Sequence, residues 1–375
     1  MHWVNTFDRH KREPHKSLEA YVKERRLELG MSIESRKKIY LDTKYWLILR
    51  DNKLGRSEHS EGAKLLDLLQ DGVQAEKLIC PISADVFIEI LKQSDPVTID
   101  CSTGLIDMLS CGVSILGPEE RLRMELLYFV RKYLFGEETC YSHKIFAWNK
   151  IAYTLGFRSP CNTPFSPEDE LAIQKAFLDQ MWELSLSDMI ETIGIDAICR
   201  RPRIPDASGE LNAGKFSHMH ENKSFNELFL SELAGMLDVY KPVFGEMFGH
   251  LFQEETGLVR SHAEVADSEG SRMIANLIYH GFRLKRLSKE VASLRIPATL
   301  YAAIRWDKGR KYKPTDLHDI RHAAGALPYF DVFLTEHSLR HLLTRKDLAL
   351  DRLYGCRVVS DLSAAIAEIE EILGK

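Results

Sequence analysis

Apolar and polar positions near the start of the chain alternate between strand and helix patterns. The apolar run at positions 39–41 is bracketed by charged residues, which is typical of a buried strand that ends at Asp42. A helix is predicted over residues 61–70, ended by Asp71-Gly72, and the segment KLICPI is predicted to form the next strand. Ser83 then caps a predicted helix, SADVFIEILKQ. Short links between strands and helices indicate a parallel sheet covered by helices.

The same alternation returns at the C-terminal end. We predict a helix, DLHDIRHAAGAL, capped by Thr315 and ended by Pro328, and then the buried strand DVFLT. A helix (HSLRHLLT), a strand (CRVVS) and a closing helix (DLSAAIAEIEEIL) capped by Ser360 follow. Neither end of the chain has enough strands for a stable sheet by itself. We therefore expect one α/β domain, formed from residues 37–99 and 297–375.

The residues between these halves, 100–296, show helical periodicity instead. We expect this insertion to be mostly α-helical, with helices over residues 118–135, 143–155, 167–193, 224–252 and 271–294. Residues 1–36 are polar and charged and carry only a weak helical pattern. They are predicted to form a loosely attached N-terminal arm.

Composition and charge narrow the class of protein. The chain has 375 residues, 28% of them charged, and a net charge of -5, which argues against a protein that coats nucleic acid without specificity. No apolar run is long enough to span a membrane, and the first residues do not resemble a secretory signal, so we expect a cytoplasmic protein with no membrane partner. The seven cysteines form no CxxC pair, which argues against a disulfide framework or a cysteine-rich zinc site.

Four acidic residues are expected near the carboxyl ends of the strands, where open parallel sheets bind their ligands. Asp42 follows the first strand, Glu89 lies on the helix after Ser83, Asp319 lies on the helix after the insertion, and Glu336 follows DVFLT. Converging carboxylates suit a hard cation such as Mg²⁺ or Mn²⁺, and two such ions can support hydrolysis of a phosphodiester. The alternative is that each acid has a structural role, as a turn residue, a helix charge or a cap.

Three segments resemble the PIN-like nuclease superfamily: YLDT at 40–43, SADVFIE at 83–89, and DIRHAAGALPYFDVFLT at 319–335. The resemblance covers residues 37–92 and 314–375. It implies a PIN-like, Rossmann-like parallel sheet and a metal-dependent nuclease that acts on RNA or, less expected, single-stranded DNA. It also implies that Asp42, Glu89 and Asp319 bind Mg²⁺ or Mn²⁺, with Glu336 as a fourth catalytic acid.

The chain departs from the family pattern at two positions. The family commonly has Asp two residues after the Thr that ends the strand, whereas His337 stands there and Glu336 precedes it. Whether Glu336 or His337 completes the site therefore stays open. Lys44 stands where Asn commonly follows Asp-Thr, and it could contact a phosphate or compete with a metal ion. Asp331, which opens the strand, is interpreted as a structural cap.

A basic segment, residues 305–313, precedes the third acid. Its lysines and arginines could hold phosphates while an aromatic ring stacks on an unpaired base. The alternative is a solvated surface, and for Trp306 a position in the core. The candidate substrate-binding residues are Lys44, Arg305, Trp306, Arg310 and Lys311. A second basic cluster is formed by Arg200, Arg201 and Arg203.

Two other hypotheses remain. His318 and His322 are four residues apart on one helix, as in zinc-binding HExxH helices, but the acid between them is a differently placed Asp. A PIN-like module that no longer cuts could instead bind a protein or nucleic acid through the sheet edge and the insertion. The sequence contains no GxxxxGK[ST], GxGxxG or GxSxG motif, and it leaves the oligomeric state undetermined.

Overall fold

The computed structural model describes residues 4–57, 60–90, 92, 95–134, 136, 142–194, 206–218, 224–256 and 269–375. Its centre is a four-stranded parallel sheet in the order β2-β1-β5-β6. The strands are β1 (Lys37–Leu41), β2 (Leu78–Ile79), β5 (Val332–Leu334) and β6 (Arg357–Val359). The predicted parallel sheet, built from both ends of the chain, is therefore confirmed.

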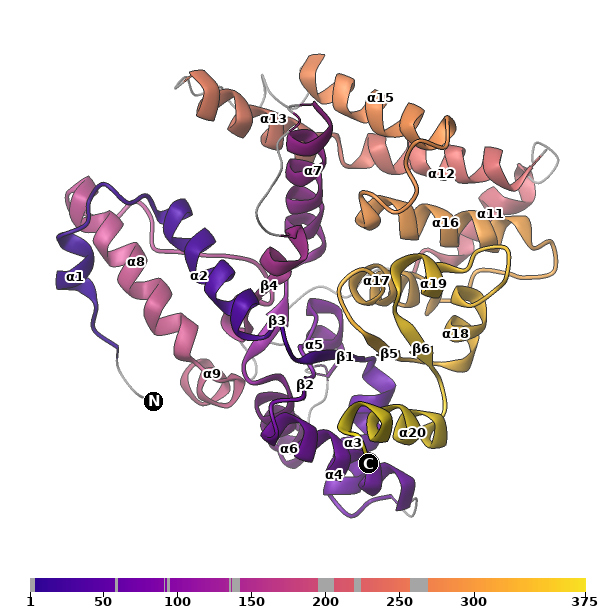
Figure 1. Ribbon diagram of the computed structural model, residues 1–375, viewed down its shortest axis with the longest axis horizontal. Coiled ribbons are helices and arrows are strands. Elements are labelled where there is room, and N and C mark those ends of the chain that lie inside the picture. The colour runs from indigo at the N-terminus through magenta and orange to yellow at the C-terminus, as the bar shows by residue number, and fades with distance from the viewer. Residues whose placement is uncertain are drawn as a thin grey trace.

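Strand β1 lies in the middle of this sheet and pairs with β5 over its full buried length. Ile39 lies opposite Val332 and Leu41 opposite Leu334. Both strands are apolar at successive positions because helices cover both faces of the sheet, so neither face needs polar side chains. In Figure 1, helices α3 (Thr43–Lys53), α4 (Ser60–Gln74) and α20 (Leu362–Leu373) lie below the strands, and α5 (Ala84–Ile90) and α17 (Asp316–Ala326) lie above them.

Two predicted helix boundaries differ from the structure, and one predicted cap makes no side-chain bond. Helix α4 continues through Gly72 to Gln74, because Gly72 packs its bare Cα against Leu78, where a Cβ would lie 2.6 Å from that side chain. Helix α20 is capped by Asp361, whose side chain accepts from the backbone of Ala364 at 2.8 Å, rather than by Ser360. Thr315 precedes α17 without a side-chain capping bond. The short helices α18 (His337–Leu343) and α19 (Leu350–Tyr354) separate β5 from β6.

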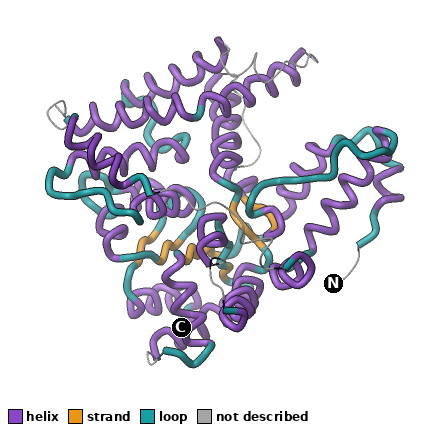
Figure 2. Tube along the Cα trace, turned by 180° about the vertical axis from the view of Figure 1, so that it is seen from behind, coloured by secondary structure: helices purple, strands orange, loops and turns teal. Residues whose placement is uncertain are grey.

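The predicted helix over residues 143–155 is wrong. This segment forms the short 3₁₀ helix η1 (His143–Ala147), strand β4 (Trp148–Lys150) and a second 3₁₀ helix, η2 (Ile151–Tyr153). Strand β4 pairs antiparallel with β3 (Val113–Ile115), which follows helix α6 (Pro96–Ser110), and Ile82 bridges to β3. Pairing with a distant strand overrides the local helical pattern and forms a second, two-stranded sheet (Figure 2).

The rest of the insertion is helical, and part of it encloses a second hydrophobic core. That core is formed by α7 (Pro118–Leu134), α12 (Phe225–Val239), α13 (Lys241–Thr256), α15 (Glu269–Arg283) and α16 (Ala292–Trp306). The single helix predicted over 224–252 breaks at Tyr240, and the one over 167–193 divides into α8 (Pro167–Glu183) and α9 (Leu186–Ile193). Ser185 begins a new capping box there, which ends one helix and starts the next. Helix α11 (Ser208–Ser217) lies beside α16, to which its Lys215 bonds.

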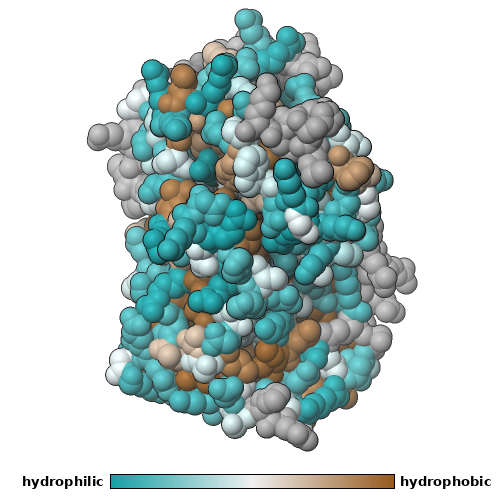
Figure 3. Space-filling view, turned by 90° about the vertical axis from the view of Figure 1, so that its right-hand side faces the viewer, coloured by the Kyte–Doolittle hydropathy of each residue, from teal (hydrophilic) through white to brown (hydrophobic). Residues whose placement is uncertain are grey.

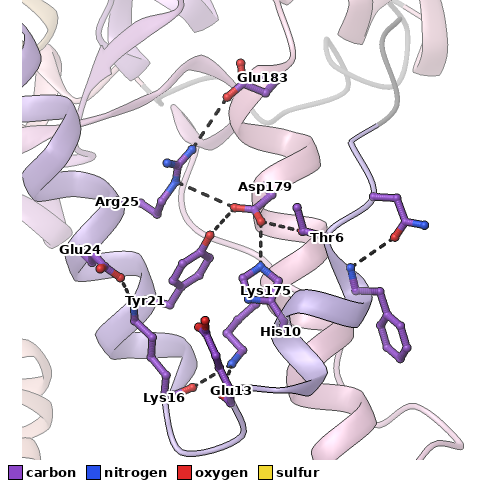
Figure 4. A network of polar contacts seen from close by, with 12 residues as sticks. Thr6, His10, Glu13, Lys16, Tyr21, Glu24, Arg25, Lys175, Asp179 and Glu183 are labelled. Carbon is purple, nitrogen blue, oxygen red and sulfur yellow. Dashed lines mark hydrogen bonds and ion pairs between the residues drawn. The ribbon is translucent and has the colours of Figure 1, made fainter.

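The N-terminal segment is not the loosely attached arm that its charge suggested. Helices α1 (Phe7–Lys11) and α2 (Leu18–Ser32) pack against α8. The buried carboxylate of Asp179 accepts hydrogen bonds from Thr6 at 2.7 Å and Tyr21 at 2.6 Å and lies 2.8 Å from Nε2 of His10 (Figure 4). Lys175 donates to the carbonyls of Glu13 and Lys16, at 2.8 and 3.1 Å. These polar side chains are buried and paired, so the segment is part of the folded structure.

Among the described helices, none combines the length and the apolar character needed to cross a bilayer. The face drawn in Figure 3 is mostly hydrophilic, with apolar side chains in separate patches. The described cysteines are free thiols, and Cys140 and Cys199 lie outside the described residues.

Candidate functional site at the carboxyl end of the sheet

The carboxyl ends of β1 and β5 bring Asp42 and Glu336 to the same edge of the sheet. The backbone N–H of Asp42 donates to the carbonyl of Leu334 at 3.1 Å, so the β1–β5 ladder continues to this residue. The Asp42 side chain is 5% exposed and caps α3 by accepting from the backbone of Tyr45 at 3.3 Å. Glu336 begins α18 and is exposed. One acid is therefore buried at this edge and the other faces solvent.

Helix α17 adds Asp319 to the same edge. Burial raises the pKa of Asp319 to about 7, and the negative charges of Glu336, Asp316 and Asp42 add to this, although His322 opposes it. Burial likewise raises the pKa of Asp42 to about 6, with Glu336 adding to the shift and His322 again opposing it. Within the described part of the chain, neither Asp42 nor Asp319 forms an ion pair. Hydrogen bonds from Thr335 and Tyr45 and the charge of His322 offset part of the cost for Asp42, and His322 does so for Asp319, but the pKa of each acid remains raised.

Glu89 is held differently, by two histidines of α17. Nδ1 of His318 lies 2.7 Å from Oε1 of Glu89, and Nε2 of His322 lies 3.6 Å from Oε2. Thr43, next to Asp42, donates its hydroxyl to Glu89. Burial by itself would raise the pKa of Glu89, but these three partners lower it well below its ordinary value. His318 and His322, whose spacing resembled that of a zinc-binding pair, therefore contact the carboxylate of Glu89.

A chain of hydrogen bonds continues from His322 into the core. The Tyr40 hydroxyl lies 2.7 Å from Nδ1 of His322 and 2.8 Å from the hydroxyl of Ser83. Burial acts to lower the pKa of His322, but Glu89, together with Asp85 and Asp42, raises it overall. The imidazole is thus favoured in its charged form next to Glu89.

A second contact joins the same two helices. Nε of Arg321 donates to Oδ1 of the buried Asp85 at 2.5 Å. Asp85 and Glu89 are four residues apart on α5, so both side chains face α17. The contacts of Glu89 with the two histidines and of Asp85 with Arg321 therefore fix α5 against α17 and set the position of Glu89.

The structure brings the three expected metal ligands to one edge without forming a ready ligand set. Among the residues that the structure describes, no three His, Cys, Asp or Glu side chains are arranged to hold a metal ion. The donor chemistry of Asp42 and Asp319 nevertheless fits a hard divalent cation, whose charge would favour the ionised forms that burial disfavours. Glu89 could join them only by leaving His318.

The basic segment before α17 is largely engaged in structural contacts. Arg305 pairs with Glu232, and Arg310 donates to Asp316 at 2.8 Å. Lys215 holds the turn by donating to the carbonyls of Ile304 and Asp307, at 2.7 and 2.5 Å.

Other candidate substrate-binding residues remain accessible. Trp306 is 41% exposed at the end of α16, so it is not a core residue. Lys311 is also exposed. Lys44 is exposed, with its ammonium 5.6 Å from the centre of the Tyr45 ring. The cluster of Arg200, Arg201 and Arg203 lies outside the described residues.

Sequence reasoning missed the residues that support the site. Tyr40, Thr43, Asp85 and Arg321 all lie within the segments that resemble the PIN-like family, yet their types alone did not indicate a role. The four-residue spacing of Asp85 and Glu89, matched by that of His318 and His322, was the available signal that two polar helix faces meet.

Comparison of the chain with protein-family models, with curated proteins and with solved structures finds no match. The functional argument therefore depends on the residues of the site themselves.

Proposed function

We propose that the protein is a metal-dependent nuclease that hydrolyses phosphodiester bonds, with RNA as the expected substrate class. The observation that carries this proposal is the position of Asp42 and Asp319. Asp42 is buried and Asp319 half-buried at the carboxyl edge of a parallel sheet; burial raises the pKa of both acids, and the charge of Asp42 adds to the shift of Asp319. Acids whose pKa is raised by burial are costly for folding when ionised, and such groups are concentrated at functional sites.

Asp42, Asp319 and Glu89 would hold Mg²⁺ or Mn²⁺ in this proposal, and Glu336 would supplement them. When bound, the cation supplies positive charge that activates a water molecule and stabilises the leaving oxygen. The buried position of Asp42 excludes water from one side of the site. His318, His322 and Thr43 keep the carboxylate of Glu89 ionised, and the cation would have to displace His318 to reach it.

The phosphate backbone of the substrate would be held by exposed cations. Lys44, next to Thr43, and Lys311, in the segment before α17, are the candidates that remain accessible. The exposed ring of Trp306 is available to stack on an unpaired base. This arrangement supports a single-stranded substrate, since stacking needs a base that is free of its partner.

Calorimetric titration with Mn²⁺ tests the proposal directly. The wild-type protein should bind Mn²⁺, and Asp42→Asn should abolish this binding because the amide keeps the shape and loses the charge. Asp67→Asn, an exposed acid on α4, is the matched control and should bind as the wild type does. Cleavage of single-stranded RNA should disappear in Asp319→Asn and in EDTA. Activity that survives EDTA would contradict the proposal.

A second candidate function is favoured by one observation. Glu89 already has charged and hydrogen-bonding partners in His318, His322 and Thr43, so this acid is satisfied without a cation. The protein would then be a PIN-like module that binds a nucleic acid or a protein without cutting. In that case Mn²⁺ gives no heat of binding, and Asp42→Asn leaves nucleic-acid affinity unchanged.

A further inference from the structure

A cavity of about 200 Å³ lies between the helical insertion and the α/β part of the protein. Its walls come from α7, the end of α12, α16 and α17. Arg121 of α7 and Arg321 of α17 line it, together with the rings of Tyr240 and Tyr301. Much of the remaining wall is apolar and includes Leu122, Met236 and Ile320. None of the acids at the carboxyl edge of the sheet takes part.

Arg121 is a buried cation with few acceptors. It is 3% exposed, and one terminal nitrogen donates to the carbonyl of Leu116 at 2.6 Å. Its Nε is buried and has no hydrogen-bond partner, and within the described part of the chain it has no ion pair. Buried guanidinium groups are normally paired, so the lack of acceptors points to a missing anion.

Glu125, one turn further along α7, is close enough for the charge of Arg121 to act to lower its pKa, but its oxygens are hydrogen-bonded to other residues. One of its oxygens accepts from the Ser293 hydroxyl at 3.0 Å and from the Tyr329 hydroxyl. The other accepts from the backbone of Ser293 at 2.8 Å. The carboxylate is therefore occupied in joining α7 to α16 and to the end of α17.

Arg321 and Tyr240 complete the polar side of the cavity. Arg321 uses Nε for Asp85, and its two terminal nitrogens have no acceptor among the described residues. Burial raises the pKa of Tyr240, whereas Arg321 and Arg121 both act to lower it against the opposing charge of Glu119. The Tyr240 hydroxyl is therefore close to both guanidinium groups, one from each part of the protein.

We propose that this cavity binds a small phosphate monoester. Guanidinium groups match the geometry of phosphate oxygens, and two of them suit a dianion better than a single carboxylate. The apolar wall would receive the organic part of the ester, and the volume limits that part to about the size of one ring. The cavity shares Arg321 with the contact that fixes α5, but none of the proposed metal ligands lines it, so binding in the cavity can be tested separately from cleavage.

Phenyl phosphate is the probe for calorimetry, with inorganic phosphate and benzoate for comparison. The wild-type protein should bind phenyl phosphate more tightly than either comparison compound. Arg121→Gln should weaken this binding at least about tenfold, because it removes a charged hydrogen-bond donor. Arg123→Gln is the matched control on the same helix, since Arg123 pairs with Glu246 at the surface and does not line the cavity.

A second variant keeps the test decisive if Arg121→Gln does not fold. Ala324→Leu adds volume to the cavity wall without removing charge, and it should abolish binding in a protein that still unfolds cooperatively. Equal binding of benzoate, or unchanged binding in Ala324→Leu, would overturn the proposal. So would the absence of any phenyl phosphate binding up to about 5 mM.

Discussion

His318 and Glu89 form a direct contact between α17 and α5, with Nδ1 of the imidazole 2.7 Å from Oε1 of the carboxylate. An acid expected to bind metal is therefore held by a side chain of the helix that carries Asp319. A cation that recruits Glu89 must compete with this contact. The contact sets the position of Glu89 and also opposes metal binding.

The first prediction concerns this competition. His318→Ala should strengthen Mn²⁺ binding by about fivefold, because a partly exposed ion pair of roughly 1 kcal/mol no longer has to be broken. His341→Ala, an exposed histidine on α18, should leave the affinity unchanged. Calorimetry measures both. Weaker Mn²⁺ binding in His318→Ala would mean that the imidazole orients Glu89 for the metal instead of competing with it.

The second prediction concerns the pH dependence of stability. The pKa of Asp319 is raised from 3.8 to about 7, so ionising this residue costs stability in the folded state. The cost is absent below the unfolded pKa, grows as the pH rises towards 7 and is complete above it. Asp319→Asn should therefore unfold at a higher temperature than the wild type at about pH 8 and at a similar temperature at about pH 4.

Thermal unfolding followed by circular dichroism checks this difference, and Asp67→Asn should show no such pH dependence. Mg²⁺ should raise the melting temperature of the wild type at high pH and leave that of Asp319→Asn unchanged, since the ion offsets the same repulsion. If Asp319→Asn melted below the wild type at every pH, ionisation of Asp319 would not be costing the folded state stability.

Much of the sheet could be predicted from the sequence because its strands are buried on both faces. The run at 39–41 and residues 332–334 within DVFLT are apolar at successive positions, which is a local signal. The pair β3–β4 had no such signal, because Trp148 and its neighbours also fit a helical pattern and only their distant partner decides the outcome. The break at Tyr240 likewise depends on packing between α12 and α13, which sequence periodicity does not record.

The sequence indicated which acids lie at the candidate site, but it did not indicate which residues contact them. The order of strands and helices in the sequence indicated where Asp42, Glu89 and Asp319 would lie, because that order determines where the backbone of each residue lies relative to the sheet. The pairing of Glu89 with His318 depends on the rotation of α5 relative to α17. No local pattern reports that rotation, so the histidines suggested zinc rather than an ion pair with a carboxylate.

The third prediction tests the docking of the N-terminal segment. Asp179→Asn should destabilise the protein by about 2 to 4 kcal/mol, because it removes a charged acceptor shared by Thr6, His10 and Tyr21. Urea denaturation measures the loss. Glu183→Gln, an exposed acid on the same helix, should change stability by less than about 0.5 kcal/mol. Limited proteolysis of Asp179→Asn should begin within residues 11–17, and a cut elsewhere would contradict this docking role.

The last prediction separates substrate binding from folding in the basic segment. Lys311 and Lys313 are exposed and form no ion pair with any described residue, whereas Arg310 is tied to Asp316 at the start of α17. Replacing both lysines with Ala should weaken binding of single-stranded RNA and reduce the slope of log K against log salt by about 0.7 per lost phosphate contact. The melting temperature should stay unchanged, because neither ammonium group supports the fold.

Arg310→Ala should have the opposite effects: it should lower the melting temperature and change the slope of log K against log salt only a little. Lys23→Ala, an exposed lysine on α2, is the control for the general effect of losing a positive charge. Filter binding over a range of salt concentrations gives the slopes. A slope that falls equally in Lys23→Ala would show that the segment acts only through net charge, and the phosphate backbone would then have to be held by residues nearer Lys44.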